Sequence, residues 1–87
     1  MSKSAPRSLA KNGAVIITYN PDNDFELNLA ASAAQLNVII IVDNGSTSPC
    51  LQKIKQCASK YSNVILIENN ANLGIAKALN IGCQYLY

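Results

Sequence analysis

The sequence contains no histidine and no tryptophan, and only 14% of its 87 residues are charged. Without histidine, no imidazole can serve as a general base or as a metal ligand. The three cysteines include no Cys-x-x-Cys pair, which argues against a structural zinc site. Their odd number also argues against the disulfide framework of a small secreted protein and fits a reducing cytosol. Catalysis by a histidine-based or cysteine-based pair is therefore excluded for this chain.

Long apolar runs and glycine-rich phosphate motifs are also missing from the sequence. The longest apolar runs, residues 14–17 and 38–42, are far shorter than the roughly 20 residues that cross a bilayer, so we expect no transmembrane segment. No Gly-x-Gly-x-x-Gly follows an apolar run and no Gly-x-x-x-x-Gly-Lys occurs. This absence argues against a dinucleotide fingerprint and against a P-loop.

The net charge of +2 comes from the start of the chain, where Lys3, Arg7 and Lys11 lie. The rest carries the other four basic side chains against five acidic ones and is nearly neutral. Its lysines are too dispersed for the basic face of a nucleic-acid-binding protein, so we expect no nucleic-acid partner. The basic start has no apolar stretch like that of a secretion signal. We therefore interpret residues 1–12 as a flexible leader before one domain, residues 13–87.

Three short apolar runs rich in β-branched residues predict three strands. Their hydrophobicity is continuous rather than alternating, which is typical of parallel strands that are buried on both faces beneath helices. The runs are residues 14–19, 38–42 and 64–67.

Three segments with helical periodicity follow these runs. Asp22 and Asp24 are placed to cap the first helix after Pro21, and Pro49 suits the first turn of the second. A polar loop and Gly74 lead into the third. The predicted apolar faces are Phe25, Leu29, Ala33 and Leu36 in the first helix, Leu51, Ile54, Cys57 or Ala58, and Tyr61 in the second, and Ile75, Leu79, Gly82 or Cys83, and Leu86 in the third.

The alternation of strand and helix predicts an α/β fold. With right-handed crossovers it gives a half-Rossmann, three-stranded parallel sheet in the order 3-2-1 with crossover helices. Such sheets bind ligands at the carboxyl ends of their strands. We therefore look for function at Asn20, at Asp43 and from Asn69 onward.

Asp43 directly follows the second apolar run, where its carboxylate would project into the ligand crevice. There it can accept hydrogen bonds from ribose hydroxyls or from a pyrimidine N–H. The alternative is that Asp43 merely orders the turn with Gly45 and Ser46, a role that aspartate often fills. The sequence leaves both readings open.

Two further segments carry candidate binding groups. Pro21 is expected to hold Asn20 extended, so that backbone groups there face a planar base, with a simple turn as the alternative. Residues 72–82 place a helix N-terminus and Lys77 near the crevice, which suits a negatively charged ligand. The alternatives are a solvated Lys77 and a Gly82 that only permits close packing of the helix on the sheet.

The stretch Asp22-Asn23-Asp24 has the Asp-x-Asp spacing that can hold Mg²⁺ or Mn²⁺. It follows the first strand and opens a helix, where both acids complement the helix dipole. We interpret it as a cap and expect no metal ligands in this chain.

Three segments in order resemble successive motifs of family 2 glycosyltransferases. They are residues 15–21 (Val-Ile-Ile-Thr-Tyr-Asn-Pro), 41–46 (Ile-Val-Asp-Asn-Gly-Ser) and 72–82 (Asn-Leu-Gly-Ile-Ala-Lys-Ala-Leu-Asn-Ile-Gly). The likeness covers residues 13 to about 84, and three ordered motifs are far more specific than one. Within that family, the Thr-Tyr-Asn-Pro opening and the third motif most resemble the rhamnosyltransferase-like branch.

The resemblance implies a GT-A fold and an inverting hexosyltransferase. It implies a nucleoside-diphosphate sugar donor such as dTDP-rhamnose, a saccharide or lipid-linked acceptor in polysaccharide biosynthesis, and a divalent metal, Mg or Mn, in the full-length enzyme. In that pattern Thr18 and Tyr19 line the nucleobase, Asp43 holds the base or ribose, and the segment from Asn72 to Asn80 completes the pocket. The nucleotide-binding candidates are Thr18, Tyr19, Asn20, Asp43, Asn44, Asn72, Gly74, Lys77 and Asn80.

The sequence departs from the family pattern at Leu79, where many members carry arginine. The family's metal-binding Asp-x-Asp and catalytic base would follow a fourth strand beyond Tyr87. We therefore expect a truncated domain that supplies nucleoside recognition, has no catalytic residue of its own and is inactive in isolation. We expect a cytoplasmic protein, with peripheral association of the full-length protein at the inner face of the membrane as a further expectation. The alternatives are a non-catalytic nucleotide-binding or interaction module and a receiver-like domain phosphorylated at Asp43.

Overall fold

The computed structural model describes residues 12–86, which form three strands and three helices in strict alternation. The predicted leader lies outside the described residues except for Asn12, whose carbonyl accepts a hydrogen bond from the Asn37 N–H at 2.8 Å. The elements are β1 (Gly13–Thr18), α2 (Asp24–Gln35), β2 (Val38–Asp43), α3 (Ser48–Ala58), β3 (Val64–Glu68) and α4 (Ile75–Leu86).

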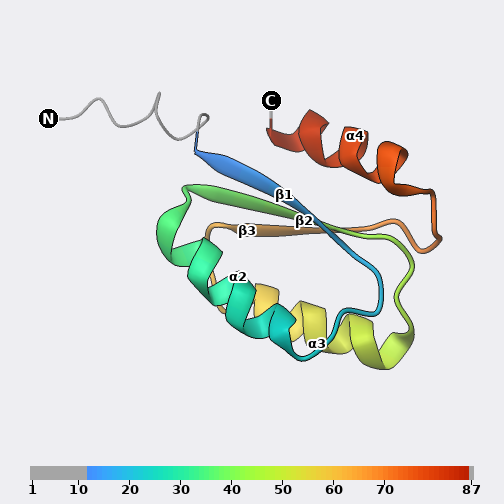
Figure 1. Cartoon of the computed structure of the whole chain (residues 1–87), viewed down its shortest axis with the longest axis horizontal. Helices are drawn as coiled ribbons and strands as arrows, with labels where there is room; N and C mark the ends of the chain where they lie inside the picture. The colour runs from blue at the N-terminus through green and yellow to red at the C-terminus, as the bar shows by residue number, and fades with distance from the viewer. Residues whose placement is uncertain (1–11, 87) are drawn as a thin grey trace, which may run out of the picture.

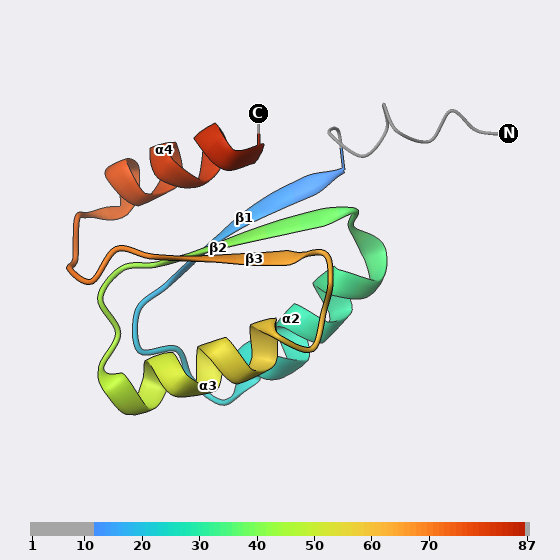
Figure 2. The ribbon, with the colours of Figure 1, turned by 180° about the vertical axis from the view of Figure 1, so that it is seen from behind.

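The three strands form one parallel sheet with β2 in the middle. Read from β3, the order is 3-2-1, so the predicted half-Rossmann arrangement is confirmed. The register pairs Thr18 with Asp43 and Asp43 with Glu68, so the three strands end at the same edge of the sheet. Helices α2 and α3 cover one face, and α4 covers the other (Figures 1 and 2). This layering explains why β2 is apolar on both faces: its residues 39–42 are all fully buried.

The core beneath α2 and α3 follows the predicted helix faces. Leu29 of α2 and Ile54 of α3 are buried against Ile39 and Ile41 of β2, and the partly buried residues Phe25, Ala33, Leu36 and Tyr61 pack around them. Both alternatives left open in α3 hold, because Cys57 and Ala58 are both buried. The spacing of apolar residues therefore oriented these two helices, except that Leu51 is only partly buried and lies outside this core, and that Tyr61 follows the end of α3.

The predicted apolar face of α4 is wrong at two positions. Ile75 is 73% exposed and Leu79 is 44% exposed, whereas Ala78 and Gly82 are buried against the sheet. A Cβ placed on Gly82 would lie 2.4 Å from a methyl group of Val15. Small residues at these two positions let the helix backbone approach the strands closely, which turns larger side chains outward. The reading of Gly82 as a packing residue is confirmed.

The start of α2 also differs from the prediction. The N-cap residue is Asn23, and its side chain makes no capping bond. Asp22 instead accepts a hydrogen bond from the Asp24 N–H at 3.0 Å, and Asp24 lies in the first helical turn. Asn23 has helical backbone angles (φ −68°, ψ −19°) rather than the extended ones in which a cap side chain reaches forward.

In residues 12–86, no helix has the length and apolar character needed to cross a membrane.

Candidate functional site

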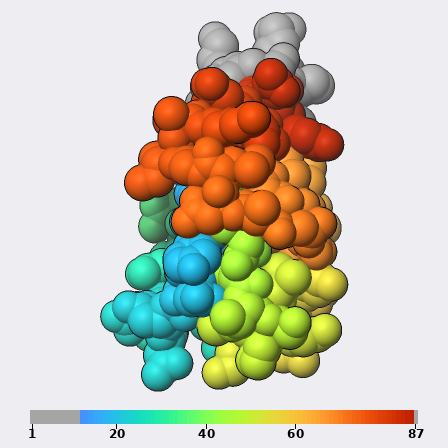
Figure 3. Space-filling view, turned by 90° about the vertical axis from the view of Figure 1, so that its right-hand side faces the viewer, coloured from blue at the N-terminus to red at the C-terminus, as the bar shows by residue number. Residues whose placement is uncertain are grey.

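The carboxyl ends of the strands bring the segments after β1, β2 and β3 together. Figure 3 looks onto this edge, where the segment after β1 (blue), the segment after β2 (green) and the segment before α4 (orange) lie side by side. Two adjacent residues at the end of β2, Asp43 and Asn44, are 1% and 3% exposed. Each joins β2 to a different neighbouring segment.

Asp43 holds the segment after β1 and its own turn. Its Oδ1 accepts hydrogen bonds from the hydroxyl of Thr18 at 2.8 Å and from the hydroxyl of Ser46. Its Oδ2 accepts from the backbone N–H groups of Ser46 at 2.9 Å and Gly45 at 3.3 Å. An ionised carboxylate has about four lone-pair sites, so these four donors occupy it fully. Asp43 therefore orders the turn, as the second of the two alternatives predicted. A contact between Asp43 and a nucleotide stays a prediction.

Asn20 does not adopt the extended conformation that Pro21 was expected to impose. Its φ is +45°, in the left-handed region that asparagine tolerates better than most residues. The hydrogen bonds that it makes explain the difference. The Asn20 N–H donates to the Ser46 hydroxyl at 2.8 Å, and the Asn20 Oδ1 accepts from the Thr47 N–H at 2.9 Å at the start of α3. Asn20 thus ties the end of β1 to the start of α3.

Asn44 holds the segment between β3 and α4. Its Nδ2 donates to Asn72 Oδ1 at 3.1 Å and to the Gly74 carbonyl at 3.4 Å. Its Oδ1 accepts from Asn69 Nδ2 at 3.2 Å and from the Leu73 N–H at 3.0 Å. The Asn44 side chain therefore contacts four residues of one loop with all of its donors and acceptors.

Two glycines make this close arrangement possible. Gly45 has φ +96°, and a Cβ added to it would lie 2.9 Å from the backbone carbon of Ala71. Gly74 has φ +85° and no atom within 4 Å of such a Cβ. Gly45 is therefore required both by its backbone angle and by the loop packed against it, whereas Gly74 is required by its angle alone.

A hollow of about 460 Å³ opens between the end of β1 and the start of α4. Tyr19, 56% exposed, and Ile17 contribute one wall, and Asn72, Gly74 and Ile75 contribute the other. Asn44, the remaining lining residue, joins β2 to that second wall. The lining contains no charged side chain. It combines an aromatic ring, aliphatic groups and amides, which suits a planar, uncharged group that forms hydrogen bonds.

The structure brings only some of the candidate residues to this hollow. Tyr19, Asn44, Asn72 and Gly74 line it, and Asn20 lies beside it in the network around Ser46. Thr18 is buried with its hydroxyl bound to Asp43. Lys77 and Asn80 are exposed on α4 and do not line the hollow.

Two residues of the polar network, Ser46 and Asn69, were not among the nucleotide-binding candidates, although the sequence indicated Ser46 as a turn partner of Asp43 and Asn69 as the start of the third polar segment. Ser46 joins Asn20 to Asp43, and Asn69 donates to Asn44. The signal for Ser46 was its place in the turn after Asp43, where a hydroxyl three residues on can reach the carboxylate. The place of Asn69 directly after β3 was the corresponding signal.

The described residues contain few groups that could hold a divalent metal. Residues 12–86 contain no group of three or more histidine, cysteine or acidic side chains that could hold an ion. Asp22 and Asp24 are exposed, and one oxygen of Asp22 already accepts the Asp24 N–H. No chemical step through a metal is therefore assigned to these residues.

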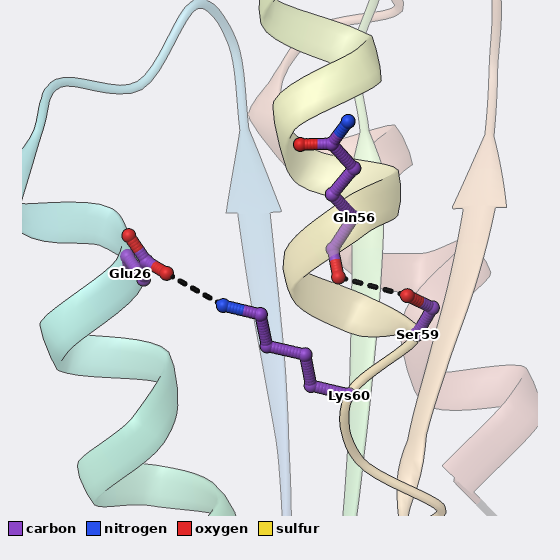
Figure 4. Close-up of polar contacts among 4 residues, drawn as sticks. All are labelled: Glu26, Gln56, Ser59 and Lys60. Atoms are coloured by element: carbon purple, nitrogen blue, oxygen red, sulfur yellow. Dashed lines mark hydrogen bonds and ion pairs between the residues drawn. The ribbon is translucent and has the colours of Figure 1, made fainter.

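A second hollow of about 460 Å³ lies between α2 and α3. The ammonium of Lys60 donates across this groove to Glu26 at 2.8 Å, and the Ser59 hydroxyl caps the end of α3 at the Gln56 carbonyl (Figure 4). The hydrogen bond and charge of Lys60 lower the pKa of Glu26, and the same contact raises the pKa of Lys60. Both side chains are solvent-exposed, so the pair marks a surface contact rather than a site.

The parallel sheet and the hollow at its carboxyl edge define an α/β protein of the kind that binds ligands at strand ends. The model of the family described as Glycosyl transferase family 2 matches residues 14–87, and the chain belongs to this family. Family membership implies a nucleotide-sugar donor and an acceptor, and supports glycosyl transfer at the family level. The match does not distinguish a rhamnosyltransferase branch. A comparison with curated proteins gives no match.

Proposed function

We propose that this chain supplies the nucleoside-binding part of an inverting glycosyltransferase that uses a nucleoside-diphosphate sugar, with dTDP-rhamnose as the donor. The observation that carries the proposal is the uncharged hollow at the carboxyl edge of the sheet, which all three family motifs help to build. Its first motif contributes Tyr19, the second Asn44, and the third Asn72 and Gly74.

The chemistry of the hollow favours the nucleoside over the diphosphate. Tyr19 presents an exposed ring on which a base can stack, and Asn72 lines the opposite wall. The Asn72 Oδ1 accepts from Asn44 Nδ2 and from the Gly74 N–H, so its Nδ2 is the group that it can offer to a ligand. The carboxylate of Asp43 is buried behind this surface and is compensated by four donors, so it repels an approaching anion little. Lys77 lies outside the hollow. We therefore place the base and ribose here and the diphosphate toward solvent.

Titration with dTDP, UDP and GDP in the presence of Mg²⁺, followed by backbone amide NMR, tests this assignment. We expect localised shifts at Tyr19, Asn44 and Gly74, with dTDP binding more tightly than GDP. Tyr19→Ala should weaken dTDP binding about tenfold, because stacking of a base on an aromatic ring is worth about 1–3 kcal/mol. Tyr85→Ala, which removes a tyrosine of similar exposure from the last turn of α4, should leave the affinity unchanged. Shifts spread evenly over the chain, or none, would refute nucleoside binding.

We also propose that the catalytic base and the divalent metal belong to parts of the enzyme other than residues 12–86. The complete enzyme would act on a saccharide or lipid-linked acceptor. It would do so in the cytoplasm, at the inner face of the membrane. Incubation of the 87-residue chain with dTDP-rhamnose and an acceptor should then release no dTDP. Nucleotide binding without transfer by a longer chain would instead favour the non-catalytic module.

A further inference from the structure

The loop of residues 69–74 is attached to the sheet through one side chain. Within residues 12–86, Asn44 is the only side chain from another segment that forms hydrogen bonds with this loop. The other hydrogen bond from the loop to β2 joins two backbones, from the Asn69 N–H to the Asp43 carbonyl at 2.9 Å, and it lies at the very start of the loop. The later part of the loop, residues 72–74, therefore depends on Asn44 for its hydrogen bonds to β2.

An amide is the side chain that this position requires. Two of the contacts need donors, to Asn72 Oδ1 and the Gly74 carbonyl, and two need acceptors, from Asn69 Nδ2 and the Leu73 N–H. A carboxylate supplies the acceptors alone, and an alkyl group supplies neither. The Gly74 carbonyl also accepts the Ala78 N–H, so Asn44 reaches the first turn of α4 as well as the loop.

The position of this loop sets the shape of the hollow. Asn72, Gly74 and Ile75 form one wall, and they face Ile17 and Tyr19 at the end of β1. Asn44 itself is 3% exposed and has its hydrogen-bonding groups occupied, so it offers a ligand little surface. Its influence on a bound molecule must therefore pass through the wall that it holds.

We propose that Asn44 is a positioning residue of the nucleoside site, which fixes loop 69–74 and the start of α4 against β2 without contacting the nucleotide. This inference rests on the proposed function. Its consequence is that loss of the Asn44 amide frees the wall formed by Asn72, Gly74 and Ile75 and so weakens nucleotide binding. This role separates Asn44 from Tyr19, whose exposed ring lines the hollow.

The test compares Asn44→Ala and Asn44→Asp in the 87-residue chain, first without nucleotide. Hydrogen exchange of the Leu73 amide reports whether the loop is held, and the buried Ile40 amide reports whether the sheet is folded. Asn44→Ala should speed exchange at Leu73 at least about tenfold and leave Ile40 protected. Asn44→Asp keeps the acceptors for Leu73 and Asn69 but loses both donors and buries a second carboxylate beside Asp43, so it should also speed exchange at Leu73. Asn44→Asp also provides the comparison with wild type if the alanine variant fails to fold.

The second measurement is the affinity for dTDP. We expect the affinity to fall in both variants, in parallel with the loss of loop protection in each. Asn70→Asp is the matched control, because it makes the same change of amide to carboxylate, but at an exposed position within the loop whose left-handed backbone aspartate tolerates. It should change neither measurement.

The outcomes separate this inference from the proposed function. If Asn44→Ala weakens dTDP binding while exchange at Leu73 in the free chain is unchanged, Asn44 contacts the nucleotide and the positioning role is overturned. If neither measurement changes, it is overturned as well. If the wild-type chain binds no nucleotide, the proposed function fails, and faster exchange at Leu73 would still establish that Asn44 holds the loop.

Discussion

The two hollows of this protein have similar volumes, about 460 Å³ each, but their polar groups differ in kind. The groove between α2 and α3 is bridged by Glu26 and Lys60, two flexible side chains that both remain in water. The hollow at the strand ends is backed by Asp43 and Asn44, which are buried and fully hydrogen-bonded. Volume alone does not separate the two places, whereas the burial of satisfied polar groups does.

The physical reason is the cost of burial. A polar group taken out of water must find a partner in the protein, so a buried network holds its members in one arrangement. An exposed pair exchanges its partner for water at little cost. Asp43 and Asn44 therefore hold the backbone around the strand ends in a defined shape, and Glu26 and Lys60 do not do the same for the groove.

The largest effect is expected from removing the carboxylate of Asp43. Asp43→Ala leaves two hydroxyls and two backbone N–H groups without their acceptor, at about 1–3 kcal/mol for each buried group, and should lower the free energy of unfolding by about 3 kcal/mol or more. Thr18→Val removes one donor and should cost only about 1 kcal/mol. Urea unfolding of both variants measures the difference. Equal effects would contradict the view that the carboxylate is the centre of the network.

A smaller effect is expected at the turn that follows. Gly45→Ala combines a backbone angle unfavourable for alanine with a Cβ 2.9 Å from the backbone of Ala71, and should cost about 2–3 kcal/mol. Gly74→Ala introduces the angle penalty without the collision and should cost about 1 kcal/mol. Thermal unfolding of the two variants isolates the contribution of the packed loop. A Gly74 variant as unstable as the Gly45 variant would show that backbone angle alone decides.

The smallest effect belongs to the exposed pair. The pKa of Glu26 is lowered in the folded state, so its contribution to stability is present above the usual carboxyl pKa and is lost as the pH falls through the lowered value. The pKa of Lys60 is raised, so its contribution is present below the usual ammonium pKa and is lost as the pH rises through the raised value. Glu26→Gln should barely change the melting temperature at neutral pH, and less still in high salt. A large loss that persists in high salt would mean that the groove is held by this pair.

Local sequence patterns were sufficient for the sheet and for two of the three helices. Continuous β-branched runs predicted the parallel strands, but burial on both faces holds only for the central strand β2, whereas the edge strands β1 and β3 are partly exposed and Ile65 is 44% exposed. The spacing of Leu29 and Ile54 oriented α2 and α3. In α4 the apolar residues cover a broad arc, so periodicity could not tell which part meets the sheet. The close fit of Ala78 and Gly82 against the strands determines which face meets the sheet, and it leaves Ile75 and Leu79 exposed.

The candidate site was predictable as a place but not in its contacts. Polar residues directly after apolar runs indicated that Asn20, Asp43 and Asn69 onward would meet, because parallel strands end at one edge. Which polar side chains form hydrogen bonds with one another depends on the distances in space between segments that are far apart in the sequence. Thr18 and Asp43 bind each other across 25 positions, and Asn44 reaches Asn72 across 28.

By itself, the sequence determined the order of the elements, the apolar character of the sheet and the three segments that gather at its carboxyl edge, since these follow from local periodicity and chain direction. The tertiary structure decided which polar groups are buried and which still face the hollow. Hydrogen bonding between distant segments can be completed only once the strands are aligned. For that reason Asp43 and Asn44 are buried and hold the strand ends together, whereas Tyr19 and Asn72 line the two walls of the hollow.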